Sequence, residues 1–326
     1  MSYLVTGAAG FIGFHVAQRL LSQGESVVGV DNINDYYSVA LKKDRLAQLA
    51  KHPGFTFHQV DLADFGALSD TLKPVGFRKV IHLAAQAGVR YGMENPHAYV
   101  QSNLAGHLNM LELCRHRDGF EGMAYASSSS VYGGNVKMPF SETDKVNTPI
   151  SLYAATKRAD ELMSNVYSHL FAMKLIGLRF FTVYGPWGRP DMAMWLFTEA
   201  ILKGKPLKVF NHGKMKRDFT YIDDIVSGIL MVIAEPGKAM NGGDPHRIYN
   251  IGNNRPEDLL HMISVLEDAL GRPAQMEMLP LQPGDIAESF ADIDAIKGDY
   301  GFQPTTPISK GIPAFVDWYK SYHAGR

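Results

Sequence analysis

The chain has 326 residues, of which 46% are hydrophobic and 20% charged, and its 32 basic and 33 acidic residues leave a formal net charge of −1. This length and apolar content predict a globular protein with a sizeable core, and the charge balance offers no global attraction for nucleic acid or an anionic membrane. No apolar run reaches the roughly 18 residues needed to span a bilayer, and the single cysteine, Cys114, excludes an internal disulfide.

Apolar runs of strand length recur along the first half of the chain and alternate with helical patterns. They cover residues 3–5, 26–30, 55–60, 79–83, 122–126 and 174–179. Runs that are apolar on both faces, with helices between them, are typical of a parallel sheet covered on both sides. We therefore predict an α/β fold of the Rossmann type, with a doubly wound parallel sheet.

Gly7, Gly10 and Gly13 follow the first predicted strand as GxxGxxG and open a helix. Glycines at this spacing permit a tight turn and let the backbone approach a pyrophosphate at the helix N-terminus. Asp31 ends the second strand, 18 residues after Gly13, where an acid binds the ribose diol of NAD and repels a 2′-phosphate. We predict bound NAD, with further contacts from Phe11, Ile12, Asn32, Asp61, Leu62, Leu83, Ala84, Ala85, Gln86, Asn103, Phe180 and Val183.

Tyr153 and Lys157 lie four residues apart in a predicted helix at about 151–171, so they share one face of it. A tyrosine is a weak base at its usual pKa of about 10, and a nearby ammonium favours the phenolate. The serine run Ser127–Ser130 ends the fifth strand, at the same edge of the sheet as the cofactor loop. YxxxK alone is a weak pattern, but with the glycine loop and the serines it predicts a hydroxyl-oxidising site.

The second half of the chain has shorter elements separated by Gly and Pro, which favours a smaller α/β substrate-binding lobe at the C-terminal end. A helix at about 222–235 is apolar enough to pack back on the sheet. We divide the chain into an NAD-binding domain (1–178, with about 219–245) and a substrate-binding domain (179–218 and 246–326). The helix at 151–171 carries an apolar stripe that is either core or a subunit interface.

Several stretches resemble one known group of enzymes. With the features above, the chain resembles the extended short-chain dehydrogenases/reductases that act on nucleotide sugars. AAQAGVRYGMENPHAYVQSN (84–103), SSSSVYGG (127–134), PISLYAATK (149–157), LRFFTVYGPWGRPDMA (178–193) and GKMKRDFTYIDDI (213–225) are similar to UDP-glucuronate 4-epimerases. The likeness covers nearly the whole chain and thins after about residue 292.

The resemblance implies a tightly held NAD, Tyr153 as base, Lys157 as its tuning cation, and Ser128 bonding the sugar O4. It places Arg217 on the diphosphate and Asp285 on the uridine ribose, and Gln282 and Arg90 are further candidates near the nucleotide or sugar. Arg189 can bind a carboxylate bidentately, with Ser129, Ser130 and Thr182 completing its hydrogen bonds. The resemblance also implies a homodimer formed by helices near 96–115 and 151–171.

The sequence leaves further functions open. Related 4,6-dehydratases and decarboxylases place acids just before the VYG motif, where this chain has Ser129 and Ser130, which disfavours elimination. A galactose-type UDP-hexose 4-epimerase and a non-catalytic NAD sensor are not excluded.

The 12 histidines form no HxxxH or HExxH pair, so we expect no metal site. We expect a soluble cytoplasmic protein with a UDP-sugar acid as its substrate, and no nucleic-acid or membrane partner.

Overall fold

The computed structural model describes residues 2–238, 240, 245–281 and 286–324. Its largest element is a seven-stranded parallel sheet with the strand order β10-β6-β5-β4-β1-β2-β3. The strands are β1 (Ser2–Thr6), β2 (Ser26–Asp31), β3 (Phe55–Gln59), β4 (Lys79–His82), β5 (Gly122–Ser128), β6 (Leu175–Phe180) and β10 (His246–Ile251). The strand order reverses between β1 and β4, which is where doubly wound sheets bind their ligands.

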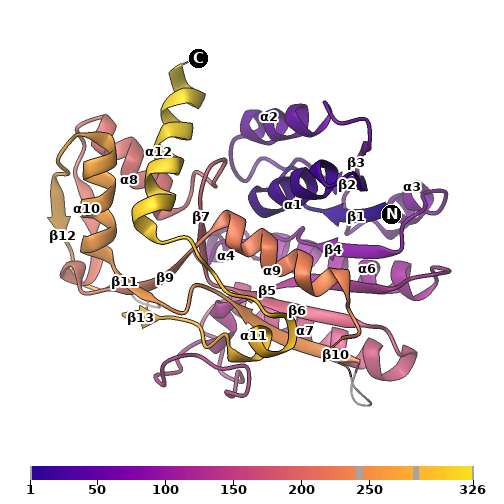
Figure 1. Cartoon of the computed structure of the whole chain (residues 1–326). Helices are drawn as coiled ribbons and strands as arrows, with labels where there is room; N and C mark the ends of the chain where they lie inside the picture. Colours follow the sequence, from indigo (N-terminus) through magenta and orange to yellow (C-terminus); the bar gives the residue numbers. More distant parts are fainter. Residues whose placement is uncertain (1, 239, 241–244, 282–285, 325–326) are drawn as a thin grey trace.

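Helices cover both faces of this sheet (Figure 1). One face carries α1 (Phe11–Ser22), α9 (Ile222–Ala234) and α11 (Asp294–Tyr300), with α2 (Val39–Leu49) beside α1. The other face carries α3 (Phe65–Leu72), α6 (Gly106–Arg115) and α7 (Leu152–Phe171). Each face has its own buried apolar cluster, so the strands are apolar on both sides, as their composition predicts. The Rossmann-type prediction is confirmed.

A smaller lobe lies at one end of the large sheet, where Figure 1 shows α8, α10 and α12 gathered together. Its four-stranded sheet contains β7 (Thr182–Tyr184), β9 (Lys216–Tyr221), β11 (Pro256–Asp258) and β13 (Glu288–Ser289), and β8 (Leu207–Val209) pairs with β12 (Met276–Met278). The helices α8 (Ala193–Leu202), α10 (Leu259–Leu270) and α12 (Ile308–Ala324) share a third apolar cluster with these strands.

Short helical segments connect the strands to the longer helices. They are α4 (Tyr91–Glu94), α5 (Pro96–Tyr99) and the π-helix η1 (Val100–Ala105) before α6, η2 (Ser129–Tyr132) after β5, and η3 (Phe210–Gly213) after β8. The segment η2 is a 3-10 turn that begins at Ser129, directly beyond the last residue of β5. The predicted serine run is therefore divided between the end of a strand and this turn.

One prediction needs correction, and one of two stated alternatives is excluded. The segment 246–251, assigned above to the smaller lobe, is the edge strand β10 of the large sheet and pairs in parallel with β6. Its side chains bury against α11 and α7, contacts that composition alone does not reveal. The apolar stripe of α7 is not core within this chain, because Leu162, Val166 and Leu170 are 51%, 49% and 63% exposed.

One further expectation about a single element holds. The helix predicted at 222–235 is α9, and it packs against α1 and the large sheet. Cys114 is buried in α6, and burial raises the pKa of its thiol to about 12.

Over the described ranges, no helix is long and apolar enough to cross a membrane, and no three His, Cys, Asp or Glu side chains are grouped to hold a metal ion.

Candidate active site

A cavity of about 730 Å³ opens along the carboxyl edge of the large sheet. It runs from the glycine loop after β1 to the loop after β7 and reaches the smaller lobe through α8 and β8. The predicted site residues that line it are Gly7, Gly10, Phe11, Ile12, Gly13, Asp31, Asn32, Asp61, Leu62, Leu83, Ala84, Ala85, Gln86, Arg90, Ser128, Ser129, Ser130, Tyr153, Lys157, Phe180, Thr182, Val183 and Arg189. The volume is within the range of small-molecule and cofactor sites.

The glycine loop leaves no room for side chains at its inner surface. A Cβ added to Gly13 would lie 2.1 Å from the carbonyl oxygen of Gly7, and one added to Gly10 would lie 2.9 Å from the same atom. Gly7 has a φ of 71°, a left-handed conformation that glycine adopts most easily. The start of α1 therefore presents backbone N–H groups to the cavity, which suits a pyrophosphate.

Asp31 is held in place by backbone donors at the end of β2. Its Oδ1 accepts the Ile33 N–H at 2.8 Å and its Oδ2 accepts the Ala9 N–H at 3.1 Å. Burial raises the pKa of Asp31, while the Ile33 N–H, nearby Lys42 and the Ala9 N–H oppose that shift. The carboxylate thus faces the cavity in a fixed orientation, and its remaining lone pairs can accept the two hydroxyls of a diol.

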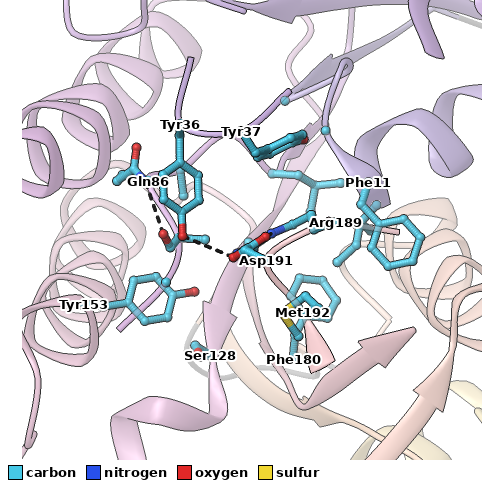
Figure 2. Close-up of a pocket in the computed structure, with 18 of the residues that line it drawn as sticks. Phe11, Tyr36, Tyr37, Gln86, Ser128, Tyr153, Phe180, Arg189, Asp191 and Met192 are labelled. Carbon is cyan, nitrogen blue, oxygen red and sulfur yellow. Dashed lines mark hydrogen bonds and ion pairs between the residues drawn. The ribbon is translucent and has the colours of Figure 1, made fainter. Parts of the chain in front are cut away.

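Tyr153 and Lys157 come from the first two turns of α7. Ser151 caps this helix by accepting the Ala154 N–H at 3.1 Å, which sets the start of the helix at the cavity wall. The Tyr153 ring packs edge-on against Tyr99, with ring centroids 6.2 Å apart. Figure 2 shows the Tyr153 hydroxyl pointing into the cavity, on the side where Ser128 lies.

Lys157 is almost fully buried and has a carboxylate partner on its own helix. Its Nζ donates to Oδ2 of Asp160 at 3.1 Å, and both side chains are at most 3% exposed. Burial raises the pKa of Asp160 to about 6, although the charge and hydrogen bond of Lys157 oppose the shift. Among the described residues, Oδ1 of Asp160 has no hydrogen-bond donor. The Lys157 charge is therefore partly balanced before any ligand binds.

The residues Ser128–Ser130, which we call the serine turn, line the same cavity as Tyr153. Figure 2 shows Ser128 on the side of the cavity toward which the Tyr153 hydroxyl points. Ser128 is the last residue of β5, and its Oγ accepts the backbone N–H of Ser130 at 3.2 Å. This bond caps the short η2 helix and fixes the start of the turn. Hydroxyl groups are thereby presented at the end of the cavity opposite the glycine loop.

Arg189 also lines the cavity, but it already holds a carboxylate of this chain. Its Nε donates to Oδ1 of Asp191 at 3.0 Å and its Nη2 to Oδ2 at 2.5 Å. Tyr36, from the loop after β2, donates its hydroxyl to the same Asp191 at 3.1 Å (Figure 2). Within the described part of the chain, Asp191 takes the Nε and one Nη2 donor and leaves the end-on pair of Nη1 and Nη2 donors for a ligand, whereas side-on binding through Nε would require Asp191 to move.

Comparison with known proteins agrees with this geometry. Residues 3–252 match the NAD dependent epimerase/dehydratase family. The chain belongs to that family. It is 46% identical to UDP-glucuronate 4-epimerase 4 of Arabidopsis thaliana over 100% of this chain and 76% of that protein. It is 45% identical to a probable UDP-glucuronate 4-epimerase of Rhizobium meliloti, with 98% and 97% covered.

A solved structure gives the same picture of the family fold. The UDP-glucuronic acid 4-epimerase from Bacillus cereus, in complex with UDP-glucuronic acid and NAD, matches with a TM-score of 0.91. The two chains are 35% identical, and the match covers 99% of this chain and 100% of that one. The match therefore covers both the large sheet and the smaller lobe of this chain.

Two of the predicted residues that the structure describes are not among those that line the cavity in this epimerase-family chain. Asn103 is buried, accepts the Gln86 N–H at 2.8 Å, and donates to the Gln86 carbonyl at 3.1 Å and to Thr156 at 2.9 Å. Asn103 joins the loop after β4 to α7, so it supports that cavity-lining loop from behind. Arg217 lies on β9 and donates to the carbonyls of Lys216 and Ala287. Gln282 and Asp285 lie outside the described residues.

Sequence reasoning missed several residues of the cavity wall. They are Asn34, Tyr36, Tyr37, Lys42, Gly88, Asp191, Met192, Lys208 and Phe210, among others. Tyr36 and Tyr37 follow β2 directly, so the rule that ligands bind beyond the carboxyl ends of parallel strands would have found them. Asp191 could also have been predicted from the sequence, because a carboxylate two residues after Arg189 is close enough to pair with it. Lys208 and Phe210 reach the cavity only because the folded smaller lobe brings them there.

Proposed function

We propose that the chain is an NAD-dependent UDP-glucuronate 4-epimerase, which interconverts UDP-glucuronate and UDP-galacturonate through a 4-keto sugar. One observation carries the proposal: Tyr153, Lys157 and the serine turn lie at one end of a single cavity whose other end is the glycine loop and Asp31. The relatives named above support the choice of substrate.

The glycine loop and Asp31 fit NAD. The close approach of Gly13 to Gly7 leaves N–H groups of α1 for the pyrophosphate, and the Asp31 carboxylate suits a ribose diol. A 2′-phosphate would meet the Asp31 charge, which favours NAD over NADP. When bound, NAD would supply reversible hydride transfer at sugar C4, so the reaction would have no net redox change.

Tyr153 takes the O4 proton during oxidation and returns it during reduction. The Lys157 ammonium stabilises the phenolate form of Tyr153, and its pairing with Asp160 holds it at this depth of the cavity. The Ser128 hydroxyl accepts or donates a hydrogen bond at the same O4. Because the same groups serve both directions, the 4-keto sugar must turn within the cavity between the two steps.

The C6 carboxylate needs its own binding groups. We place it against the hydroxyls of Ser129, Ser130 and Thr182, all of which line the cavity. Arg189 supplies the positive charge, either end-on through Nη1 and Nη2 or side-on after Asp191 moves away. We assign the diphosphate and uridine to Arg217, Gln282 and Asp285, with Arg90 beside the phosphates or the sugar.

The large sheet and its helices, residues 1–178 with about 219–251 and α11, then form the cofactor domain, and the remaining residues form the nucleotide-sugar domain. The added strand β10 and the helix α11, which packs on it, are the changes to the division predicted from the sequence. We place the protein in the cytoplasm, since the cofactor and the nucleotide sugar are metabolites of that compartment.

A homodimer completes the proposal. The exposed apolar residues Leu108 on α6 and Leu162, Val166 and Leu170 on α7 cover one side of two neighbouring helices. A second copy packing its own α6 and α7 there would bury them. We expect a dimer mass by light scattering, and a monomer for Leu162→Glu. A wild-type monomer at micromolar concentration would contradict this part.

The function is tested by incubating the purified protein with UDP-glucuronate and no added NAD, and identifying products by mass and proton NMR. An isomer of equal mass with inverted C4 supports the proposal and a retained cofactor. Loss of the mass of carbon dioxide would make the enzyme a decarboxylase. Turnover of UDP-glucose alone would favour a neutral-sugar epimerase, and Arg189→Ala should then leave activity intact.

A further inference from the structure

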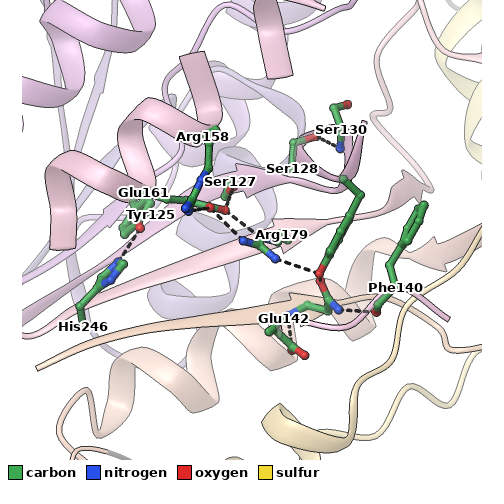
Figure 3. Close-up of polar contacts among 12 residues, drawn as sticks. Tyr125, Ser127, Ser128, Ser130, Phe140, Glu142, Arg158, Glu161, Arg179 and His246 are labelled. Carbon is green, nitrogen blue, oxygen red and sulfur yellow. Dashed lines mark hydrogen bonds and ion pairs between the residues drawn. The ribbon is translucent and has the colours of Figure 1, made fainter. Parts of the chain in front are cut away.

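Glu161 is a buried carboxylate that the mechanism above does not use. It lies eight residues after Tyr153 on α7, and its side chain is fully enclosed. Figure 3 shows three side chains converging on it. Ser127 Oγ donates to Oε1 at 2.6 Å, Arg179 donates through Nε to Oε1 at 2.8 Å and through Nη2 to Oε2 at 2.9 Å, and Arg158 donates to Oε2 at 2.9 Å.

Arg179 extends the network to the far end of the serine turn. Its Nη1 donates to the Tyr132 hydroxyl at 3.0 Å, and its guanidinium lies 4.9 Å from the centre of the Tyr132 ring. Tyr132 in turn donates to the side chain of Asn250 on β10 at 2.6 Å. Since Ser127 precedes the serine turn and Tyr132 follows it, the Glu161–Arg179 pair holds this turn from both sides (Figure 3).

Burying the Glu161–Arg179 ion pair costs desolvation free energy, and both carboxylate oxygens and all three guanidinium nitrogens of the pair have hydrogen-bond partners. Burial alone would raise the pKa of Glu161, but the hydrogen bonds and charge of Arg179, with bonds from Ser127 and Arg158, lower it instead. Buried ion pairs add little net stability compared with apolar residues of similar volume, so their value is often in fixing one arrangement. Here the arrangement is the position of β5 and its turn relative to α7, which carries Tyr153.

We propose that the Glu161–Arg179 pair is a positioning device that fixes the serine turn against Tyr153 and thereby prevents loss of the substrate carboxylate during turnover. This inference rests on the proposed function. The carbonyl of the 4-keto sugar is β to the C6 carboxylate, which the serine turn holds. A turn of fixed position keeps the C5–C6 bond out of alignment with the π system of the carbonyl.

Loss of that restraint has a defined chemical outcome. When the C5–C6 bond aligns with the carbonyl it breaks, and its electron pair enters an enolate between C4 and C5. Carbon dioxide leaves, and a proton adds to C5. The two electrons already removed from C4 remain on the nicotinamide, so each event yields one UDP-4-keto-pentose, one carbon dioxide and one reduced cofactor.

The test measures this product ratio in variants of the full-length protein. Carboxyl-labelled UDP-glucuronate is turned over, and labelled carbon dioxide is divided by UDP-galacturonate formed. Glu161→Gln should raise the ratio at least about fivefold, the factor that one lost hydrogen bond supports. Ser127→Ala and Tyr132→Phe remove one hydroxyl from each end of the network, keep the ion pair, and should each raise the ratio by a smaller factor. Reduced cofactor should accumulate in parallel.

Arg158→Met is the matched control. Arg158 bonds the same Glu161 carboxylate, but within the described ranges it has no hydrogen bond to Ser127 or Tyr132, and its side chain is 27% exposed. It should leave the ratio unchanged even where it lowers the thermal unfolding midpoint. An equal rise in Arg158→Met would show that stability, not position, controls the ratio, and would overturn the proposal.

The remaining outcomes distinguish failure of the positioning role from failure of the proposed function. An unchanged ratio in Ser127→Ala and Tyr132→Phe would also overturn the proposal, and these two variants decide the matter if Glu161→Gln does not fold. If the wild-type protein does not epimerise UDP-glucuronate at all, the proposed function fails rather than the role of this pair. If the wild type epimerises cleanly and the variants do too, only the positioning role is rejected.

Discussion

Gly13→Ala gives the sharpest test of how the cofactor loop is built. The new Cβ would lie 2.1 Å from the Gly7 carbonyl oxygen and 2.7 Å from the Gly7 carbonyl carbon, whereas real Cβ contacts stay beyond about 3.0 Å. The loop and α1 must therefore separate by about 0.9 Å. Forcing such a separation in a packed interior costs about 1–3 kcal/mol of folding free energy.

The loss of cofactor affinity should be larger than the loss of stability suggests. A shift of this size breaks the alignment of backbone N–H groups with the pyrophosphate. Losing two charge-assisted hydrogen bonds of about 1.5 kcal/mol each weakens binding roughly 100-fold. The assay is calorimetric titration of NAD into protein freed of its cofactor, with thermal unfolding measured on the same samples.

Gly298→Ala is the matched control, because Gly298 is also helical but its added Cβ would meet nothing within 4 Å. Alanine there should leave NAD binding unchanged and stabilise α11 by up to about 1 kcal/mol, the usual difference in helix propensity. If Gly13→Ala binds NAD within threefold of wild type and unfolds like Gly298→Ala, the close approach at Gly13 does not form the cofactor site.

Three further predictions follow from single side chains. Tyr153→Phe should lower kcat by about 10²–10⁴ while NAD stays bound, and a smaller loss would remove Tyr153 as the base. Burial raises the pKa of Asp31, so NAD affinity should weaken as pH falls through that raised pKa, and Asp31→Asn should abolish this pH dependence. Asp160, with its pKa raised from 3.8 to about 6, contributes stability that is present below pH 4 and lost as pH rises through 6. At 1.36 kcal/mol per unit, Asp160→Asn should flatten the pH dependence of urea unfolding by up to about 3 kcal/mol over that window, and an unchanged slope would contradict the assigned burial.

Much of the cofactor site could be read from the sequence because its determinants are local. A strand, a glycine turn and a helix start within a few residues of one another, and Gly7 and Gly13 meet through that short path. Tyr153 and Lys157 are one helical turn apart, so their relation depends only on the helix that contains them. The edge at which Asp31 and the serine turn meet follows from the parallel sheet itself.

The arrangement of charge in the site could not be read in the same way. Arg189 was predicted to face a substrate acid, but the fold pairs it with Asp191, which also accepts the hydroxyl of Tyr36 from 155 positions away in the chain. The sequence did not predict that the Asp160 carboxylate pairs with Lys157, since a helical pattern alone does not show which face of the helix will be buried.

The fold class, the cofactor loop and the pair of catalytic candidates follow from the sequence, because backbone geometry and short spacing are sufficient for these. The packing of the folded chain is needed to show that residues 246–251 complete the large sheet, that the α7 stripe faces outward, and that Glu161 and Arg179 hold the serine turn. Such contacts join elements that are distant in the chain, and their partners are chosen by how whole helices and strands pack together.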